Sequence, residues 1–243
     1  MLFKSRADKL FDQGVVFLNQ ANYPEAIKLF SQVIDVSSGS ETKFGAYINR
    51  GMAYSIVADR TLYDNFPIGD EDREKIDEYC NLAIKDFSNA IYTMTLYYPP
   101  ITTENKTDLA DIYRKRAMTY LTLANFKEAI DDINKAIEFE PKNPLFHFVC
   151  GYLYAEFIGD ASTGLDKYSK SITLSPSAET YLFRAWANFD LGKLDRAKED
   201  FRSAIKLNPE YKSAKRVIPV TIETDYVLMF DKTLKWANFI ESL

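Results

Sequence analysis

Two stretches decide the fold of this chain: YLTLANFKEAIDDINKAIEFEP at residues 120–141 and NFDLGKLDRAKEDFRSAIKLNP at residues 188–209. The first carries Ala129, Ile133 and Ala136 at offsets where the second also has a small, a large and a small residue, and both end in proline. Such a pattern, recurring in units of about 34 residues, indicates repeated helical hairpins. A hairpin this short cannot bury its own apolar face, so the units must stack into a solenoid with a concave surface.

The pattern fits the chain five times. Each unit has two small residues at matched places: Gly14 and Ala26, Gly51 and Ala83, Ala117 and Ala129, Gly151 and Gly164, Ala185 and Ala197. On these residues, and on the prolines that end three of the units, the chain resembles the tetratricopeptide repeat family over about residues 6 to 209. In that family the small residues lie where the two helices of a unit touch.

The resemblance implies an all-α fold, a right-handed α-solenoid of about five tetratricopeptide-type helical hairpins plus a C-terminal capping helix. We predict a single solenoid domain over residues 1–243. Its repeats lie at about 7–40, 44–97, 110–143, 144–177 and 178–211, and its cap at 212–243.

Three departures from the repeat pattern carry further expectations. Repeat two has about 20 extra residues between Tyr54 and Ala83, which we expect to lengthen both of its helices into a projecting hairpin; the alternative is a loose acidic loop. Pro99 and Pro100 exclude a continuous helix before repeat three. Repeat four has one extra residue, which we place in the turn at 159–164.

Composition limits the function classes. The net charge of −5 argues against general nucleic-acid binding, which needs clustered Lys and Arg. Two cysteines, Cys80 and Cys150, are too few for a disulfide framework. The N-terminus lacks the apolar segment of a signal peptide, and we find no membrane span, so we expect a cytoplasmic protein.

Catalytic, metal and cofactor motifs are missing from the sequence. The only histidine, His147, falls at a helix-packing position, and with two distant cysteines it makes no zinc constellation. The carboxylate pairs Asp131–Asp132 and Glu199–Asp200 are interpreted as part of a solvated helix face. There is no phosphate-binding glycine loop. We therefore predict no enzymatic activity, no metal and no cofactor.

The family's concave surface is lined by the first helix of each unit, and the resemblance extends this to the present chain. The predicted partner-binding residues are polar in the earlier repeats and aromatic in the later ones: Asn49, Arg114, Lys115, Phe148, Tyr152, Phe183, Trp186 and Phe189. Met52, Asp111 and Met118 fall at the same set of positions. The carboxylate clamp of cochaperone repeats is not reproduced, because Phe11, Val15 and Asp111 replace three of its five parts.

These residues predict a scaffold that binds a peptide or helix of a partner protein in its concave groove. The alternative is a structural or self-associating protein. In that case the aromatic groove is covered by the chain's own helix at about 222–240 or by a second subunit of a homo-oligomer.

Overall fold

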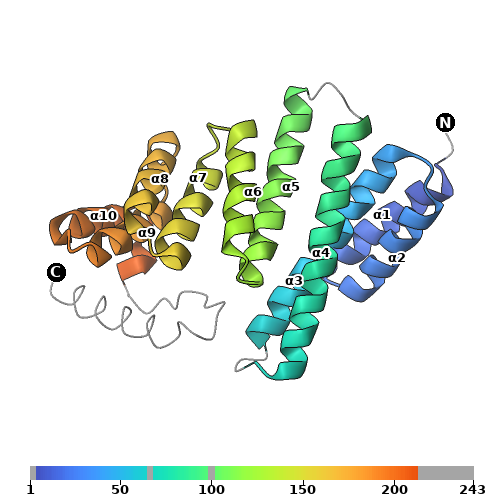
Figure 1. Ribbon diagram of the computed structural model, residues 1–243, viewed down its shortest axis with the longest axis horizontal. Helices are drawn as coiled ribbons and strands as arrows, with labels where there is room; N and C mark the ends of the chain where they lie inside the picture. Colours follow the sequence, from blue (N-terminus) through green and yellow to red (C-terminus); the bar gives the residue numbers. More distant parts are fainter. Residues whose placement is uncertain (1–3, 65–67, 98–101, 213–243) are drawn as a thin grey trace. The chain divides into compact units, whose positions relative to one another are not determined.

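The computed structural model describes residues 4–64, 68–97 and 102–212, and in this part of the chain all regular structure is helical (Figure 1). The chain divides into two compact units, Met1–Phe139 and Glu140–Leu243, named here the N-terminal and C-terminal units. The prediction of an all-α repeat fold is confirmed. The predicted cap, beyond the short 3₁₀ turn at Pro209–Lys212, lies outside the described residues.

The N-terminal unit holds three helical hairpins. Its helices are α1 (Arg6–Asn19), α2 (Tyr23–Val36), α3 (Ser40–Asp64), α4 (Asp70–Tyr97), α5 (Thr103–Thr122) and α6 (Phe126–Phe139). The C-terminal unit holds two hairpins, built from α7 (Pro144–Tyr152) with its π-helical continuation η1 (Leu153–Ile158), α8 (Ala161–Leu174), α9 (Ala178–Asp190) and α10 (Leu194–Leu207). Within each unit consecutive helices pack against each other.

Local sequence explains where the helices begin. Ser5 and Asp8 form a reciprocal capping box at α1, in which each side chain accepts a hydrogen bond from the other residue's backbone N–H. Thr102, Asp160 and Ser177 cap α5, α8 and α9 through side-chain oxygens. Each cap satisfies an amide that a helix N-terminus leaves without an intrahelical partner.

The small residues of the repeat pattern allow the two helices of a hairpin to touch. A Cβ at Gly14 would lie 2.7 Å from the ring of Phe30, and one at Gly151 would lie 2.8 Å from the ring of Tyr168. Both rings are completely buried. The pattern therefore records close helix contact, as the resemblance implied.

The extra residue of repeat four was predicted in the turn, and this is wrong. In repeats one, three and five the turn contains one left-handed residue at a matched place, namely Ala21, Ala124 or Gly192. The equivalent residue of repeat four, Gly159, comes one position later. The preceding helix absorbs the extra residue by changing from α-helix to π-helix at Leu153–Ile158.

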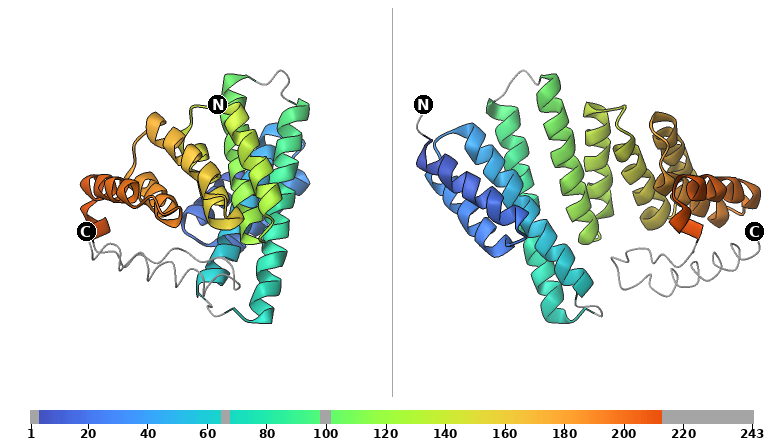
Figure 2. Two further views of the ribbon diagram at one scale, coloured as in Figure 1. Left: turned by 60° about the vertical axis from the view of Figure 1, so that its left-hand side comes forward. Right: turned by 180° about the vertical axis from the view of Figure 1, so that it is seen from behind.

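The insertion in repeat two forms a helical hairpin and not a loop. α3 has 25 residues and α4 has 28, whereas the helices of repeat one have 14 each. The far ends of α3 and α4 extend past the neighbouring helices of the N-terminal unit in each view (Figures 1 and 2). Ala58, Leu62, Ile76 and Cys80 form a buried cluster between the lengthened helices.

Three buried ion pairs recur at matched positions of the repeats. In each set, an arginine on the first helix of a repeat donates two hydrogen bonds to an aspartate on the second helix, and a third to a serine of the preceding repeat. The arginine–aspartate N–O distances are 2.6–2.9 Å. The sets are Arg50 with Asp86 and Ser31, Arg116 with Asp132 and Ser88, and Arg184 with Asp200 and Ser169.

The ion pairs correct the interpretation of two carboxylates as surface residues, and they support that of an insertion in repeat two. Asp132 and Asp200 were assigned to a solvated face, but both are buried and paired. Arg50 and Asp86 are 36 residues apart, against 16 for the pairs in repeats three and five. Repeat two thus keeps the contact of the other repeats with twenty additional residues between its partners.

Candidate functional site

The N-terminal unit has a recess between α3 and α5, the first helices of repeats two and three. It encloses about 230 Å³. The helices α3 and α5 supply the walls, and Cys80 and Phe87 of α4 contribute to the lining. The wall residues are Met52, Ser55, Ile56, Asp59, Arg114, Lys115, Met118, Thr119 and Thr122.

Two hydroxyl contacts join the walls. The Thr119 hydroxyl donates to the Lys115 carbonyl at 3.1 Å, so Ser55 donates to Thr119 across the 2.9 Å that separates their oxygens. Farther along, the Thr122 hydroxyl lies 3.3 Å from an oxygen of Asp59. These contacts join α3 to α5 across the recess, although the Thr122 hydroxyl also lies 3.2 Å from the carbonyl of Met118 on its own helix.

The apolar part of the recess comes from Met52, Ile56 and Met118. Met118 is 36% exposed, and apart from Asp59, which is also exposed, the other lining residues are half-buried or buried. Methionine is flexible and polarizable, and it is frequent at surfaces that accept varied apolar partners. This region can therefore bury an apolar side chain from outside the chain.

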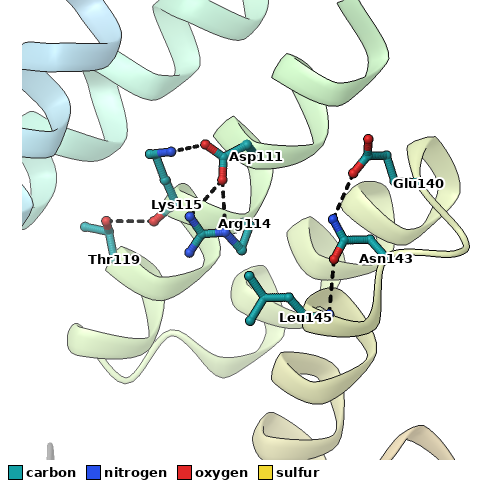
Figure 3. A network of polar contacts seen from close by, with 7 residues as sticks. All are labelled: Asp111, Arg114, Lys115, Thr119, Glu140, Asn143 and Leu145. Atoms are coloured by element: carbon teal, nitrogen blue, oxygen red, sulfur yellow. Dashed lines mark hydrogen bonds and ion pairs between the residues drawn. The ribbon is translucent and has the colours of Figure 1, made fainter. Parts of the chain in front are cut away.

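Two cations of the lining, Arg114 and Lys115, belong to a charged cluster on α5 with Asp111, which adjoins the recess without being one of its lining residues (Figure 3). Arg114 donates through Nε at 3.0 Å and Nη2 at 2.7 Å to one oxygen of Asp111, and Lys115 donates to the other oxygen. Burial acts to raise the pKa of Asp111, but the hydrogen bonds and charges of Lys115 and Arg114 outweigh it and hold that pKa below its usual value.

The predicted polar residues are only partly brought together. Arg114 and Lys115 line the recess, whereas Asn49 is not among its lining residues, and its side chain donates to the carbonyl of Gly45 on its own helix at 2.8 Å. Sequence reasoning left out Ser55, Ile56 and Thr119. The family's groove positions include those of Ser55 and Ile56, so the resemblance carried a signal for both.

The five predicted aromatic residues all lie in the C-terminal unit and are all half-buried. Phe183 of α9 is at the centre, with its ring centroid 5.3 Å from Phe148, 5.4 Å from Tyr152 and 4.8 Å from Trp186, each in an edge-to-face arrangement. Such geometry is favourable for aromatic pairs. Phe148, Tyr152, Phe183 and Trp186 therefore form one packed aromatic cluster instead of separate side chains in water.

The end of the described chain packs on the core of repeat five. Trp186, Phe189 and Tyr211 each pack against the buried residues of this core. Tyr211 belongs to the 3₁₀ turn that ends at Lys212, the last described residue. The chain thus leaves the described structure at the core of repeat five, on which Trp186 and Phe189 also pack.

His147, Cys80 and Cys150, the side chains considered above for catalysis or metal binding, are buried. The Nε2 atom of His147 lies 2.9 Å from the carbonyl of Pro141. Burial raises the pKa of the Cys80 thiol to about 12, and it raises the pKa of Cys150 as well. In the described residues no three acidic, His or Cys side chains gather as a metal site would need. No described helix combines the length and apolar character needed to cross a membrane.

Comparisons with known proteins bear on the repeats. Family models of the tetratricopeptide repeat match residues 110–143 and 178–211, the bounds given above to repeats three and five. The chain is 20% identical over 278 residues to a TPR repeat-containing protein of Methanocaldococcus jannaschii. The alignment covers 95% of this chain and 43% of that protein, so the chain spans less than half of that relative's length.

Solved structures with the same fold cover most of the chain. The crystal structure of the MamA protein has a TM-score of 0.62 at 16% identity and covers 88% of this chain and 97% of MamA. That of YrrB, a TPR protein with an unusual peptide-binding site, has a TM-score of 0.58 at 14% identity and covers 83% of this chain and 86% of YrrB.

Proposed function

Because the chain is a tetratricopeptide repeat protein, a class in which interaction with other proteins is the general role, we propose that it is a non-catalytic scaffold that binds a partner's peptide or helix in the α3–α5 recess. The observation that carries this proposal is the recess itself, where Met52, Ile56 and the exposed Met118 adjoin the charged cluster of α5. Apolar anchors beside a few placed polar groups are what a peptide site needs. The peptide-binding site ascribed to YrrB, which shares the fold, agrees with this role.

The energetic case rests on Met118. An anchor side chain that enters the recess removes its own apolar surface and that of Met118 from water, at about 25 cal/mol per Å². A lysine at position 118 would place a charge at this contact, and burying an unpaired charge is strongly unfavourable. The site therefore predicts that the single substitution Met118→Lys weakens binding strongly without touching the buried core.

The experiment uses a phage-displayed library of random dodecapeptides selected on the full chain. Enriched peptides are synthesised and titrated against the wild type, Met118→Lys and Leu96→Lys. Leu96 is the matched control, because it is an exposed apolar residue of α4 that does not line the recess. We expect Met118→Lys to weaken binding at least tenfold and Leu96→Lys to leave it unchanged, with both variants folded by circular dichroism. Enriched peptides that bind all three proteins alike would refute a site in the recess.

One observation favours a second candidate, a self-associating or self-covered protein. The described chain ends against the core of repeat five, on which Trp186 and Phe189 also pack, and the sequence that follows has apolar residues at Tyr226, Phe230 and Leu234, a helical spacing. A tethered segment acts at high effective concentration, so it is a strong competitor for the half-buried rings.

This second candidate is tested in the full-length chain. The Trp236→Phe variant leaves Trp186 as the sole tryptophan, and Phe230→Glu with Leu234→Glu is then added. A red shift of Trp186 emission at constant monomeric mass supports cover by the chain's own tail. A dimer that dissociates supports a second subunit. Unchanged emission and mass contradict both.

A further inference from the structure

The charged cluster of α5 has an imbalance between its donors and its acceptors. A guanidinium and an ammonium group together offer more N–H donors than one carboxylate can accept. Two nitrogens of Arg114 donate to the carboxylate of Asp111, and the ammonium group of Lys115 donates to the same carboxylate. The cluster also has two positive charges against one negative charge. The remaining N–H donors and the excess positive charge of the cluster therefore favour the binding of a further anion.

The three side chains differ in their access to solvent. Asp111 is the most exposed, at 43% for its side chain, against 24% for Arg114 and 19% for Lys115. A released Asp111 could therefore be solvated by water where it stands. The two cations are half-buried and would lose more if they were left without an acceptor. Exchange of Asp111 for an incoming carboxylate is thus the least costly way to bind an anion here.

The apolar neighbours of the cluster determine what accompanies that anion. Met118 follows Lys115 by less than one helical turn on α5, and both line the recess with Met52 and Ile56 of α3. A ligand that reaches Arg114 and Lys115 therefore also meets methionine side chains. A basic ligand that reached this part of the recess would meet both cations, whereas Asp59, the acidic residue of the lining, lies next to Thr122.

We propose that the recess recognises a peptide segment in which an acidic side chain stands beside an aliphatic one, with Asp111 as an internal competitor for Arg114 and Lys115. This rests on the proposed function, since it specifies the partner of the same recess. The acidic group bound is a side chain, so recognition does not require the free carboxyl end of the peptide. Asp111 is then a residue that sets specificity and lowers affinity.

The chain provides its own probes for a test. Five methionines can be labelled with carbon-13 at the methyl group. Met52 and Met118 line the recess, whereas Met94 is buried in the core of the N-terminal unit and serves as the internal control. Assignment follows from single Met→Leu variants.

The ligands are synthetic dodecapeptides that are acetylated and amidated, so that only side chains carry charge. One has Leu-Glu at its centre in a Gly-Ser background, and its partners have Leu-Gln, Leu-Lys or Ala-Glu. Each is titrated into the full chain, into Asp111→Asn and into Asp131→Asn. Asp131 is the matched control, an exposed aspartate of α6 that does not line the recess.

We expect the Leu-Glu peptide to shift Met52 and Met118 but not Met94, and to bind more tightly than the other three. Asp111→Asn should tighten Leu-Glu binding by about twofold to fivefold, the range of a partly exposed ion pair, while Leu-Gln binding and the Asp131→Asn protein stay unchanged. Raised salt should weaken the Leu-Glu complex and not the Leu-Gln complex.

Failure of this inference differs from failure of the proposed function. Equal binding of Leu-Glu and Leu-Gln, or Asp111→Asn without tighter Leu-Glu binding, overturns the acidic specificity and leaves peptide binding in place. If neither the designed peptides nor those enriched from the library shift Met52 and Met118, both proposals are overturned.

Discussion

Removal of one buried carboxylate should show how much the repeated ion pairs contribute. Asp132 is 5% exposed and accepts two hydrogen bonds from Arg116, both of 2.7 Å, in a bidentate arrangement. Asp132→Ala leaves this arginine charged, with two donors facing an apolar interior. Loss of one partner of a buried pair costs about 3–5 kcal/mol. Because the Arg116 side chain keeps 17% of its exposure and its contact to Ser88, we expect about 3 kcal/mol.

The neighbouring residue supplies the control. Asp131→Ala removes the same group one position away, where the side chain is exposed and has no ion pair among the described residues. It should change the free energy of unfolding by less than about 0.5 kcal/mol. Urea unfolding followed by far-UV circular dichroism compares the two. Equal, small effects would refute the assignment of Asp132 to a stabilising pair.

A double variant separates the pair from the space it fills. Arg116→Met with Asp132→Leu replaces both charges by apolar side chains, which for buried pairs is often neutral or stabilising. We expect it to recover most of the stability lost in Asp132→Ala. A double variant as unstable as the single one would mean that the loss comes from packing and not from an unpaired charge.

Two further predictions follow from burial. Gly151→Ala would place a methyl group 2.8 Å from the ring of Tyr168 and should cost about 1–3 kcal/mol by thermal or urea unfolding, whereas Gly69→Ala, with no atom within 4 Å, should change stability little. Cys80, with a pKa raised to about 12, stays a protonated thiol at neutral and mildly alkaline pH; neither cysteine should react with a thiol reagent until denaturant is added, and rapid labelling of the native chain would contradict their burial.

The repeat pattern predicted the backbone well because it records sterics. Gly14, Gly51 and Gly151 are small where a ring of the second helix lies against the first helix, and a spacing fixed by contact is readable from sequence. The insertion was predicted as a hairpin because its acidic start and helical periodicity lie next to each other in the chain. Local signals of this kind need no knowledge of the partner element.

The ion pairs were missed, although the repeat carries a signal for them: an arginine directly before the small residue of the first helix and an aspartate three residues after that of the second. Asp131 and Asp132 are adjacent and identical, but the packing of α6 against α5 leaves one exposed and brings the other to Arg116. The candidate site also depends on packing between helices. Asp111 was read as a defect in a known clamp, yet its contacts to Arg114 and Lys115 make it the centre of the charged cluster. The contacts of Asp111 with Arg114 and Lys115 could be expected from their spacing on one helix. The recess that they adjoin could not, because it forms only where α3 lies beside α5.

Repeat four shows that the repeat pattern fixes the backbone contact and leaves its chemistry open. Repeats two, three and five have an arginine and an aspartate at the ion-pair positions, whereas repeat four has Cys150 and Lys167 there. The described hairpin of repeat four therefore has no such ion pair. Its centre is instead Tyr168, completely buried under Gly151 and in ring contact with Phe148 and Phe183.

The π-helical turn at Leu153–Ile158 occurs in the same repeat in which an aromatic centre replaces the ion pair. It brings Ala155 to the second helix, where a Cβ at Gly164 would lie 2.7 Å from the Ala155 methyl group. Gly151 and Gly164 are the small residues at the two places where the helices touch, so the hairpin packs around the ring of Tyr168. No charged side chain at the ion-pair positions then needs a partner in the interior.

An aromatic centre tolerates an added helical residue, because ring packing has no fixed donor and acceptor to keep in register. An arginine–aspartate pair has such a requirement. Repeat one, with Gln13 and Leu29 at the matched places, also lacks the pair but keeps a regular α1, so the missing pair permits an added residue and does not require one.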